Sequence, residues 1–266
     1  MPWILLRSAV WLELPADRID LRLYAMAQAS LAGTLLLAGA AAALSRAPRL
    51  VLAVLGTNAL AHLLLDACEV KWGGGVHLLA PLSWRATRFG LFANEGALNL
   101  ALTAAGLGLI LWELLRAPLP RIGLTRAPRR VAVAALLAAL YLTAPLAVLG
   151  NVEASDSYSI ATLRDVAGRT GCTVELDRAR FRHTPIADYL ELWTGERLRV
   201  TGRVLDHDAP VSLRGVFTGP HELRIDAIVE HRFDRDWPSY AALALLAVLL
   251  ARGFLPDRSA TGRPSP

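Results

Sequence analysis

The chain has 266 residues, of which 54% are hydrophobic, and its mean hydropathy is +0.40. A soluble domain is usually about 45–50% apolar, so the excess indicates a protein that uses lipid as part of its solvent. The net charge of +5 comes almost entirely from arginines in loops beside apolar segments. Arginines in such loops set membrane orientation, which argues against binding to nucleic acid. The two cysteines, Cys68 and Cys172, exclude a disulfide scaffold.

Apolar stretches long enough to cross a bilayer recur along the chain. A spanning helix needs about 20 apolar residues, so the shorter stretch at residues 1–14 predicts an interfacial or re-entrant segment. This stretch also lacks the basic start and the cleavage site of a signal peptide. Five later stretches predict transmembrane helices: Ala25–Leu44, Leu50–Leu65, Ala93–Leu114, Val131–Leu149 and Pro238–Phe254. We therefore expect a transmembrane domain at 1–150, a last span within 238–256 and a disordered tail at 257–266.

The arginines between these spans predict the orientation of the chain in the membrane. The loop after the third span has five arginines and no acid: Arg116, Arg121, Arg126, Arg129 and Arg130. Short loops with this bias stay in the cytoplasm, and the turn at Arg46 and Arg49 and the C-terminal tail fall on the same side. We expect a multi-pass protein of the bacterial inner membrane, with residues 151–237 in the periplasm or outside the cell.

Residues 151–237 predict a folded extramembrane domain. Residues 160–171 have the spacing of an amphipathic helix, and alternation in Leu198-Arg-Val-Thr-Gly-Arg-Val-Leu205 is typical of half-buried strands. The predicted strands are Thr173–Leu176, Arg197–Val204, Val211–Phe217 and Glu222–Glu230. Short strands separated by glycine turns indicate a small β-rich domain, either an OB-like barrel or a sandwich. The predicted fold is thus a membrane α-helical bundle of about five spans that carries this domain.

The first candidate for chemistry lies near the outer end of the second span. His62 and Asp66 are four residues apart, so both face one side of a helix. An imidazole and a carboxylate at this spacing can bind one divalent metal ion, such as Zn, Mn or Fe. Ionisable residues inside a span are costly and point to function. In the alternative interpretation, Asp66 simply ends the span at the headgroups and His62 bonds a neighbouring helix.

The loop that follows adds two candidates on the same side of the membrane. His77 lies after three successive glycines, which let the backbone approach other groups closely. Glu95 stands at the start of the third span. His77 would be a further metal ligand, and Glu95 a catalytic carboxylate. The alternatives are an ordinary loop histidine and an acid that favours a helix N-terminus. Trp72 and Trp84 fit the aromatic belt of a membrane interface.

This region also resembles a known family. The resemblance is to the bacterial inner-membrane predicted metal-dependent hydrolases, a group also described as LexA-binding, and it covers residues 50–96. It rests on three elements: His62-Leu-Leu-Leu-Asp66, Trp72-Gly-Gly-Gly-Val-His77-Leu-Leu-Ala-Pro81-Leu-Ser-Trp84 and Phe89-Gly-Leu-Phe92. It implies a metal held by His and Asp at the aqueous boundary of the membrane. The two histidines of the family's N-terminal motif are absent here, and Ser30 keeps its place. Asp17 and Asp20 are the nearest carboxylates there.

Two functions follow from the sequence. The first is a membrane-bound metal-dependent hydrolase, in which His62, Asp66 and His77 hold the metal and Asp17, Asp20 or Glu95 acts as general base. Its partners would be membrane lipid and a lipid-linked substrate. The second is a non-catalytic, membrane-anchored protein whose extramembrane β domain binds a partner or ligand. The remaining histidines are interpreted as structural or solvent-facing: His183, His207, His221 and His231.

Overall fold

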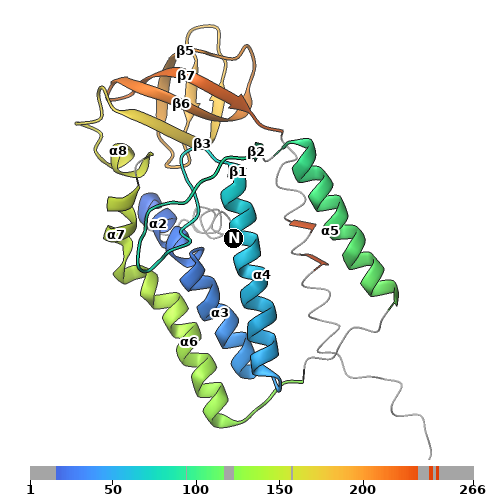
Figure 1. Cartoon of the computed structure of the whole chain (residues 1–266). Coiled ribbons are helices and arrows are strands. Elements are labelled where there is room, and N and C mark those ends of the chain that lie inside the picture. The colour runs from blue at the N-terminus through green and yellow to red at the C-terminus, as the bar shows by residue number, and fades with distance from the viewer. Residues whose placement is uncertain are drawn as a thin grey trace, which may run out of the picture.

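A computed structural model describes residues 16–93, 95–116, 123–156 and 158–232, together with 240–241 and 244–245. Helices form one end of the molecule and a β-barrel forms the other (Figure 1). The predicted segment at 1–14 and the tail at 257–266 lie outside the described residues, and so does most of the predicted span Pro238–Phe254. The two cysteines, Cys68 and Cys172, are both free.

The predicted first span is broken into two helices. Helix α2 covers Arg18–Gln28 and helix α3 covers Leu31–Leu44, and their axes meet at 63°. The Ser30 side chain caps α3 by accepting a hydrogen bond from the Gly33 backbone N–H at 3.2 Å. A Cβ at Gly33 would lie 2.3 Å from the Gln28 carbonyl oxygen, so only glycine fits this corner. The expectation of one continuous helix over Ala25–Leu44 was therefore wrong.

Helices α4 (Pro48–Cys68) and α6 (Pro128–Ala147) are long and apolar enough to cross a membrane. At about 1.5 Å per residue, each is roughly 30 Å long, the thickness of the hydrocarbon core. Proline at the first turn starts both helices without losing a hydrogen bond. Both helices form where the sequence predicts the spans Leu50–Leu65 and Val131–Leu149, except that α6 ends before Leu149.

Helix α3 packs against both α4 and α6, and small residues allow this close approach. Ala38, Ala40 and Ala42 are buried on α3. Helix α5 (Ala97–Arg116) forms at the predicted third span but stands apart from this group (Figure 1). Its described apolar part, Ala97–Trp112, is shorter than a full span. The described residues thus include two helices that could span a membrane, or three if α2 and α3 count as one span, and not the five that the sequence predicts.

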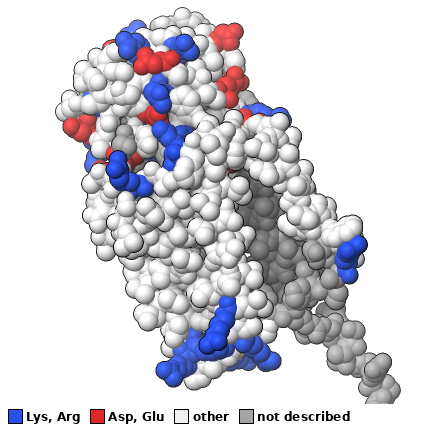
Figure 2. Space-filling model, in the orientation of Figure 1, with Lys and Arg blue, Asp and Glu red and all other residues white. Residues whose placement is uncertain are grey.

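Arginines gather at the end of the helices that is remote from the barrel (Figure 2). The Arg46 backbone N–H donates to the Gly123 carbonyl at 2.7 Å, and the Arg130 guanidinium donates to the Ser45 carbonyl at 2.8 Å. The turn after α3 and the loop before α6 therefore meet at one end of the molecule. Acidic and basic side chains are mixed on the barrel at the other end.

The predicted extramembrane domain forms a closed barrel of five strands. The strands are β3 (Thr173–Arg182), β4 (Tyr189–Glu191), β5 (Arg197–Gly202), β6 (Ala209–Gly219) and β7 (Glu222–Glu230). Their order around the barrel is β3-β4-β5-β7-β6, with β5 and β7 parallel and the other pairs antiparallel. This is a closed Greek-key barrel of the OB type, as expected, and not a sandwich.

Two short helices connect α6 to the barrel. Helix α7 covers Leu149–Ser155 and α8 covers Ile160–Arg164. The predicted helix over 160–171 was too long, because the Asp165 carboxylate turns the chain by accepting from the Gly168 N–H at 3.0 Å. The loop between α4 and α5 pairs β1 (Glu69–Val70) with β2 (Phe92–Ala93) in parallel.

The barrel core continues into the helices. Alternate residues of the strands fill the interior, among them Phe181, Leu198, Leu213, Phe217 and Ile225. The same buried cluster includes Ile19, Leu23 and Ala27 of α2, together with residues of α7 and α8. Because this apolar core is shared, the barrel is seated on the helices.

Candidate functional site

The predicted metal ligands at the end of α4 lie at its surface. His62 is exposed. Asp66 is half-buried, and its carboxylate forms an ion pair with Lys71 at 3.2 Å. The Lys71 ammonium also lies 3.7 Å from the Glu69 carboxylate. The carboxylate of Asp66 is therefore paired with a lysine ammonium group and not with a second metal ligand.

His77 is the predicted residue with the most unusual environment. Its side chain is buried, its ring centroid lies 5.9 Å from that of Trp84, and neither ring nitrogen has a hydrogen-bond partner among the described residues. Burial lowers the pKa of His77 because it disfavours the charged imidazolium, and the nearby Trp84 backbone, followed by the negative charge of Asp156, only partly opposes this effect. The His77 carbonyl accepts from the Leu31 backbone N–H, which fastens this loop to the start of α3.

The predicted carboxylates Asp17 and Asp20 are brought together at one arginine. Asp17 caps α2, and Asp20 forms a 2.6 Å ion pair with Arg164. Arg164 also pairs with Glu153 of α7 at 2.6 Å. The hydrogen bond to Asp20 is the largest effect on the pKa of Arg164 and, together with the one to Glu153, raises that pKa although burial lowers it. This cluster holds α2, α7 and α8 together.

Glu95 lies at the other side of the barrel base. It accepts hydrogen bonds from His231 Nδ1 at 2.8 Å and from the Arg232 backbone N–H at 3.2 Å. His231 Nε2 lies 2.7 Å from Ser212 Oγ, which donates to Asp177 at 2.6 Å. When a serine, a histidine base and an acid follow one another in this order, the base can activate the serine hydroxyl as a nucleophile. Ser212, however, is fully buried, and its hydroxyl donates its hydrogen bond to Asp177 and not to the histidine. These contacts therefore have a structural effect, because they join the barrel to the start of α5.

The predicted residues therefore form several separate contacts. Among the residues that the structure describes, no three His, Cys, Asp or Glu side chains lie close enough to hold one metal ion. The other histidines of the barrel each contact a carboxylate, as the structural interpretation expected: His183 with Asp188, His207 with Asp206 and Glu230, and His221 with Glu196.

A buried carboxylate joins the loop after α4 to the barrel. Glu175 of β3 accepts from Arg88 at 2.7 Å, from the Gly73 N–H at 3.2 Å and from Arg214 Nε at 3.0 Å. Burial alone raises the pKa of Glu175, but the hydrogen bonds from these three donors outweigh it and lower the pKa overall. Gly73 has φ +63°, and a Cβ there would meet the Glu175 carbonyl oxygen at 2.4 Å. The glycines thus provide the close approach that the sequence predicted.

The barrel carries a different kind of site on the outer face of β3, β4 and β5. In the register of these strands, Arg182, Tyr189 and Arg199 stand in one row across the face. Arg180, Glu191 and Arg197 form the adjacent row. Side chains at paired positions project from the same face of a sheet, while Phe181, Leu190 and Leu198 point into the core.

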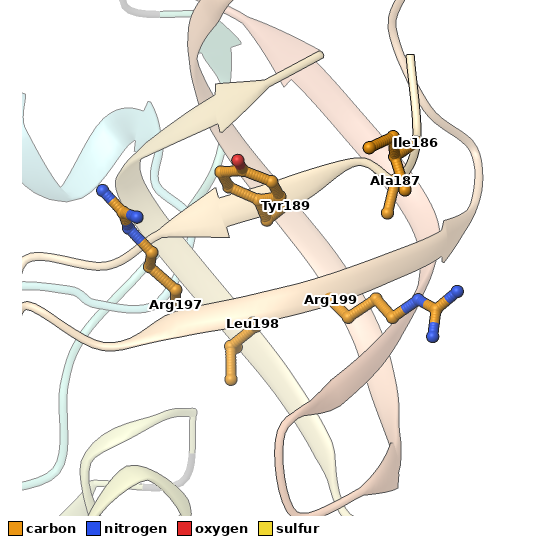
Figure 3. A pocket seen from close by; sticks show the side chains of 6 residues that line it. All are labelled: Ile186, Ala187, Tyr189, Arg197, Leu198 and Arg199. Carbon is orange, nitrogen blue, oxygen red and sulfur yellow. The ribbon is translucent and has the colours of Figure 1, made fainter. Parts of the chain in front are cut away.

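A hollow of about 500 Å³ lies on this face, open to solvent (Figure 3). The Tyr189 ring stands between the guanidinium groups of Arg197 and Arg199, and Leu198 points to the other side of the sheet. The Arg197 guanidinium lies 5.8 Å from the centre of the Tyr189 ring and pairs with Glu191 at 2.9 Å. Arg199 forms no ion pair with any described residue.

The β3–β4 loop, residues 183–188, borders this hollow. It carries Ile186, whose side chain is 96% exposed, and Ala187. His183 Nδ1 lies 2.9 Å from Asp188, and the His183 backbone N–H donates to Asp208 at 2.9 Å. Both contacts hold the ends of the loop in place while leaving Ile186 at the rim.

Comparisons with protein-family models, with curated proteins and with solved structures each found no match. The resemblance to the metal-dependent hydrolases therefore stays a prediction. Sequence reasoning missed the hollow because β4 has only three residues and gives no alternating pattern. The signal that was present lies in Arg197-Leu-Arg199, where alternation places two arginines on one face.

Proposed function

We propose that the chain is a membrane-anchored binding protein that holds a ligand on the outer face of β3, β4 and β5. The observation that carries this proposal is the hollow in which Tyr189 stands between Arg197 and Arg199, and Arg199 has no ion pair within the described part of the chain. The hollow is shallow and wide open to solvent, so a ligand would lie along this face and would not be enclosed in a pocket. OB barrels bind ligands on their second and third strands, which correspond here to β4 and β5.

The seating of the barrel supports the same function. Helix α2 and the contacts of Glu175 fix the barrel to the helices from below. Strand β5 lies at the end of the molecule remote from α4 and α6 (Figure 1). The binding face is thus presented away from the membrane, while the helices act as the anchor.

We place the barrel on the outer side of a bacterial inner membrane. The support is the group of arginines at the opposite end, because arginine-rich loops stay in the cytoplasm. Alkaline phosphatase, which is active only outside the cytoplasm, tests this orientation. A fusion within the β5–β6 loop at Arg203 should be active and one at Arg126 inactive. The reverse pattern would overturn the placement.

Cysteine labelling in cells tests whether the face is occupied. In a chain with Cys68→Ser and Cys172→Ser, the variant Ile186→Cys places a thiol at the rim of the hollow. A bound ligand should slow its labelling by an impermeant maleimide in intact cells relative to purified protein. Val204→Cys, on the β5–β6 loop and 43% exposed, is the control, and its labelling rate should be the same in intact cells and in purified protein. The ratio of the rate in cells to the rate in purified protein should therefore be lower for Ile186→Cys than for Val204→Cys. Equal ratios for the two variants would contradict the proposal.

A metal-dependent hydrolase remains a second proposal, and one observation favours it. His77 is buried, and its two ring nitrogens have no hydrogen-bond partner in the described ranges, whereas buried nitrogens usually have one. The donors described do not fit a metal site by themselves, because His62 is exposed and Asp66 pairs with Lys71. Elemental analysis of the purified protein tests the proposal. A stoichiometric divalent metal that His77→Ala removes would support it, and metal-free protein would refute it.

A further inference from the structure

We infer that the barrel face binds an anionic oligosaccharide, a chain of sugar rings that carries carboxylate or phosphate groups. This inference rests on the proposed function of the face and adds the chemical class of its ligand. Three observations support it: the excess of positive charge on the face, the single aromatic ring within the hollow, and the acid between the arginines.

The two rows of paired positions across β3, β4 and β5 carry more positive than negative charge. Arginine occupies four of the six positions (180, 182, 197 and 199), and Glu191 is the one acid in these rows. Glu191 pairs with both Arg182 and Arg197, and Asp208 of the β5–β6 loop also pairs with Arg182, so these acids offset part of the charge. Arginine binds carboxylate and phosphate groups in a planar, bidentate manner. An anionic ligand would supply the partner that Arg199 lacks among the described residues.

Tyr189 provides a surface for a ring. Its side chain is half-buried and lines the hollow, with a hydroxyl at its tip (Figure 3). Tyrosine combines an apolar body with a polar end, which suits the apolar face and the hydroxyls of a sugar. Neighbouring strands are about 4.8 Å apart, so the backbones at Arg182 and Arg199 lie roughly 10 Å apart on either side of Tyr189. A ligand must therefore be extended to contact both arginines.

The same residues disfavour single-stranded nucleic acid. Proteins that bind such strands stack successive bases on several aromatic side chains. Tyr189 is the one aromatic residue at the outward positions of β3, β4 and β5. The carboxylate of Glu191 lies in the adjacent row, where it can accept hydrogen bonds from sugar hydroxyls. A chain of hydroxyl-bearing rings with carboxylate groups therefore matches one aromatic ring flanked by arginines better than a strand of stacked bases does.

The test uses the full-length protein in nanodiscs and three probes of similar length: an oligogalacturonate, an uncharged galactose oligomer and an oligo-dT strand. We expect the oligogalacturonate to bind and the uncharged oligomer to bind at least tenfold more weakly. Arg199→Gln should weaken oligogalacturonate binding by roughly tenfold to a hundredfold, because a charged hydrogen bond is lost. Arg203→Gln is the matched control, since Arg203 is exposed outside the hollow, and it should change binding by less than about twofold.

The other outcomes separate this inference from the proposed function. Equal or tighter binding of oligo-dT would overturn the oligosaccharide and leave a binding face. Failure of all three probes, with Ile186→Cys still protected in cells, would overturn the anionic oligosaccharide alone. Failure of all probes with no protection in cells would overturn the binding function as well. Equal effects of Arg199→Gln and Arg203→Gln would place any binding outside the hollow and overturn both.

Discussion

Neutralising Glu175 should destabilise the junction between the barrel and the membrane helices. In Glu175→Gln, the carboxylate becomes a neutral amide with a single acceptor oxygen, so Arg88 and Arg214 both lose their ion pair with this side chain. A hydrogen bond to a charged group contributes about 1.5–3 kcal/mol and a neutral one about 0.5–1.5, so each arginine loses roughly 1 kcal/mol. The Arg214 side chain is 52% exposed, and solvent screens much of its share. The expected loss is about 1–2 kcal/mol, or a fall of about 2–8 °C in the unfolding temperature.

The dependence of this loss on pH identifies its cause. The pKa of Glu175 is lower in the folded protein than its ordinary value of 4.5. The charged carboxylate therefore stabilises the fold above pH 4.5, and this contribution disappears as the pH falls through the folded pKa. Thermal unfolding of purified protein at pH 7 and in acid should show a gap between wild type and variant that closes in acid. Glu222→Gln, an exposed control, should change stability by less than about 0.5 kcal/mol. A gap that persists in acid would refute this account.

Two further predictions concern single positions near the barrel. Gly73→Ala should lower the free energy of unfolding by about 1–3 kcal/mol, because φ is +63° and the added Cβ would meet the Glu175 carbonyl oxygen. Gly74→Ala is the control: its Cβ would enter open space, so the same thermal unfolding assay should show almost no change. The hydrogen bond to Asp206, followed by that to Glu230, raises the pKa of His207 above 6.5, so NMR titration should give a higher value that Glu230→Gln lowers. Its stabilising effect is present below the unfolded pKa and is lost as the pH rises through the folded value.

Local pattern predicted the barrel better than it predicted the helices. Alternation marked β5, β6 and β7, because each strand has one buried and one exposed face. The break between α2 and α3 was missed, because the residues on both sides of Ser30 are apolar and a count of apolar residues gives no weight to one capping serine. Ser30 was the available signal, because serine favours a helix N-cap over a helix interior.

The candidate site could not be assembled from sequence alone, because its contacts join distant parts of the chain. Arg164 pairs with Asp20 across 144 residues, and His231 with Glu95 across 136. Such partners decide whether a carboxylate is a ligand or one half of an ion pair. The order of the strands likewise places Tyr189 between Arg182 and Arg199, and no spacing in the sequence shows that neighbourhood.

The labelling rate of Ile186→Cys in intact cells, with and without Arg199→Gln, tests the binding face most directly. We predict that the thiol is protected in cells when Arg199 is present and that Arg199→Gln restores the rate measured with purified protein. The added Arg203→Gln change should leave the protection intact. Protection that persists unchanged in Arg199→Gln, or no protection in either background, would contradict a ligand held at this face.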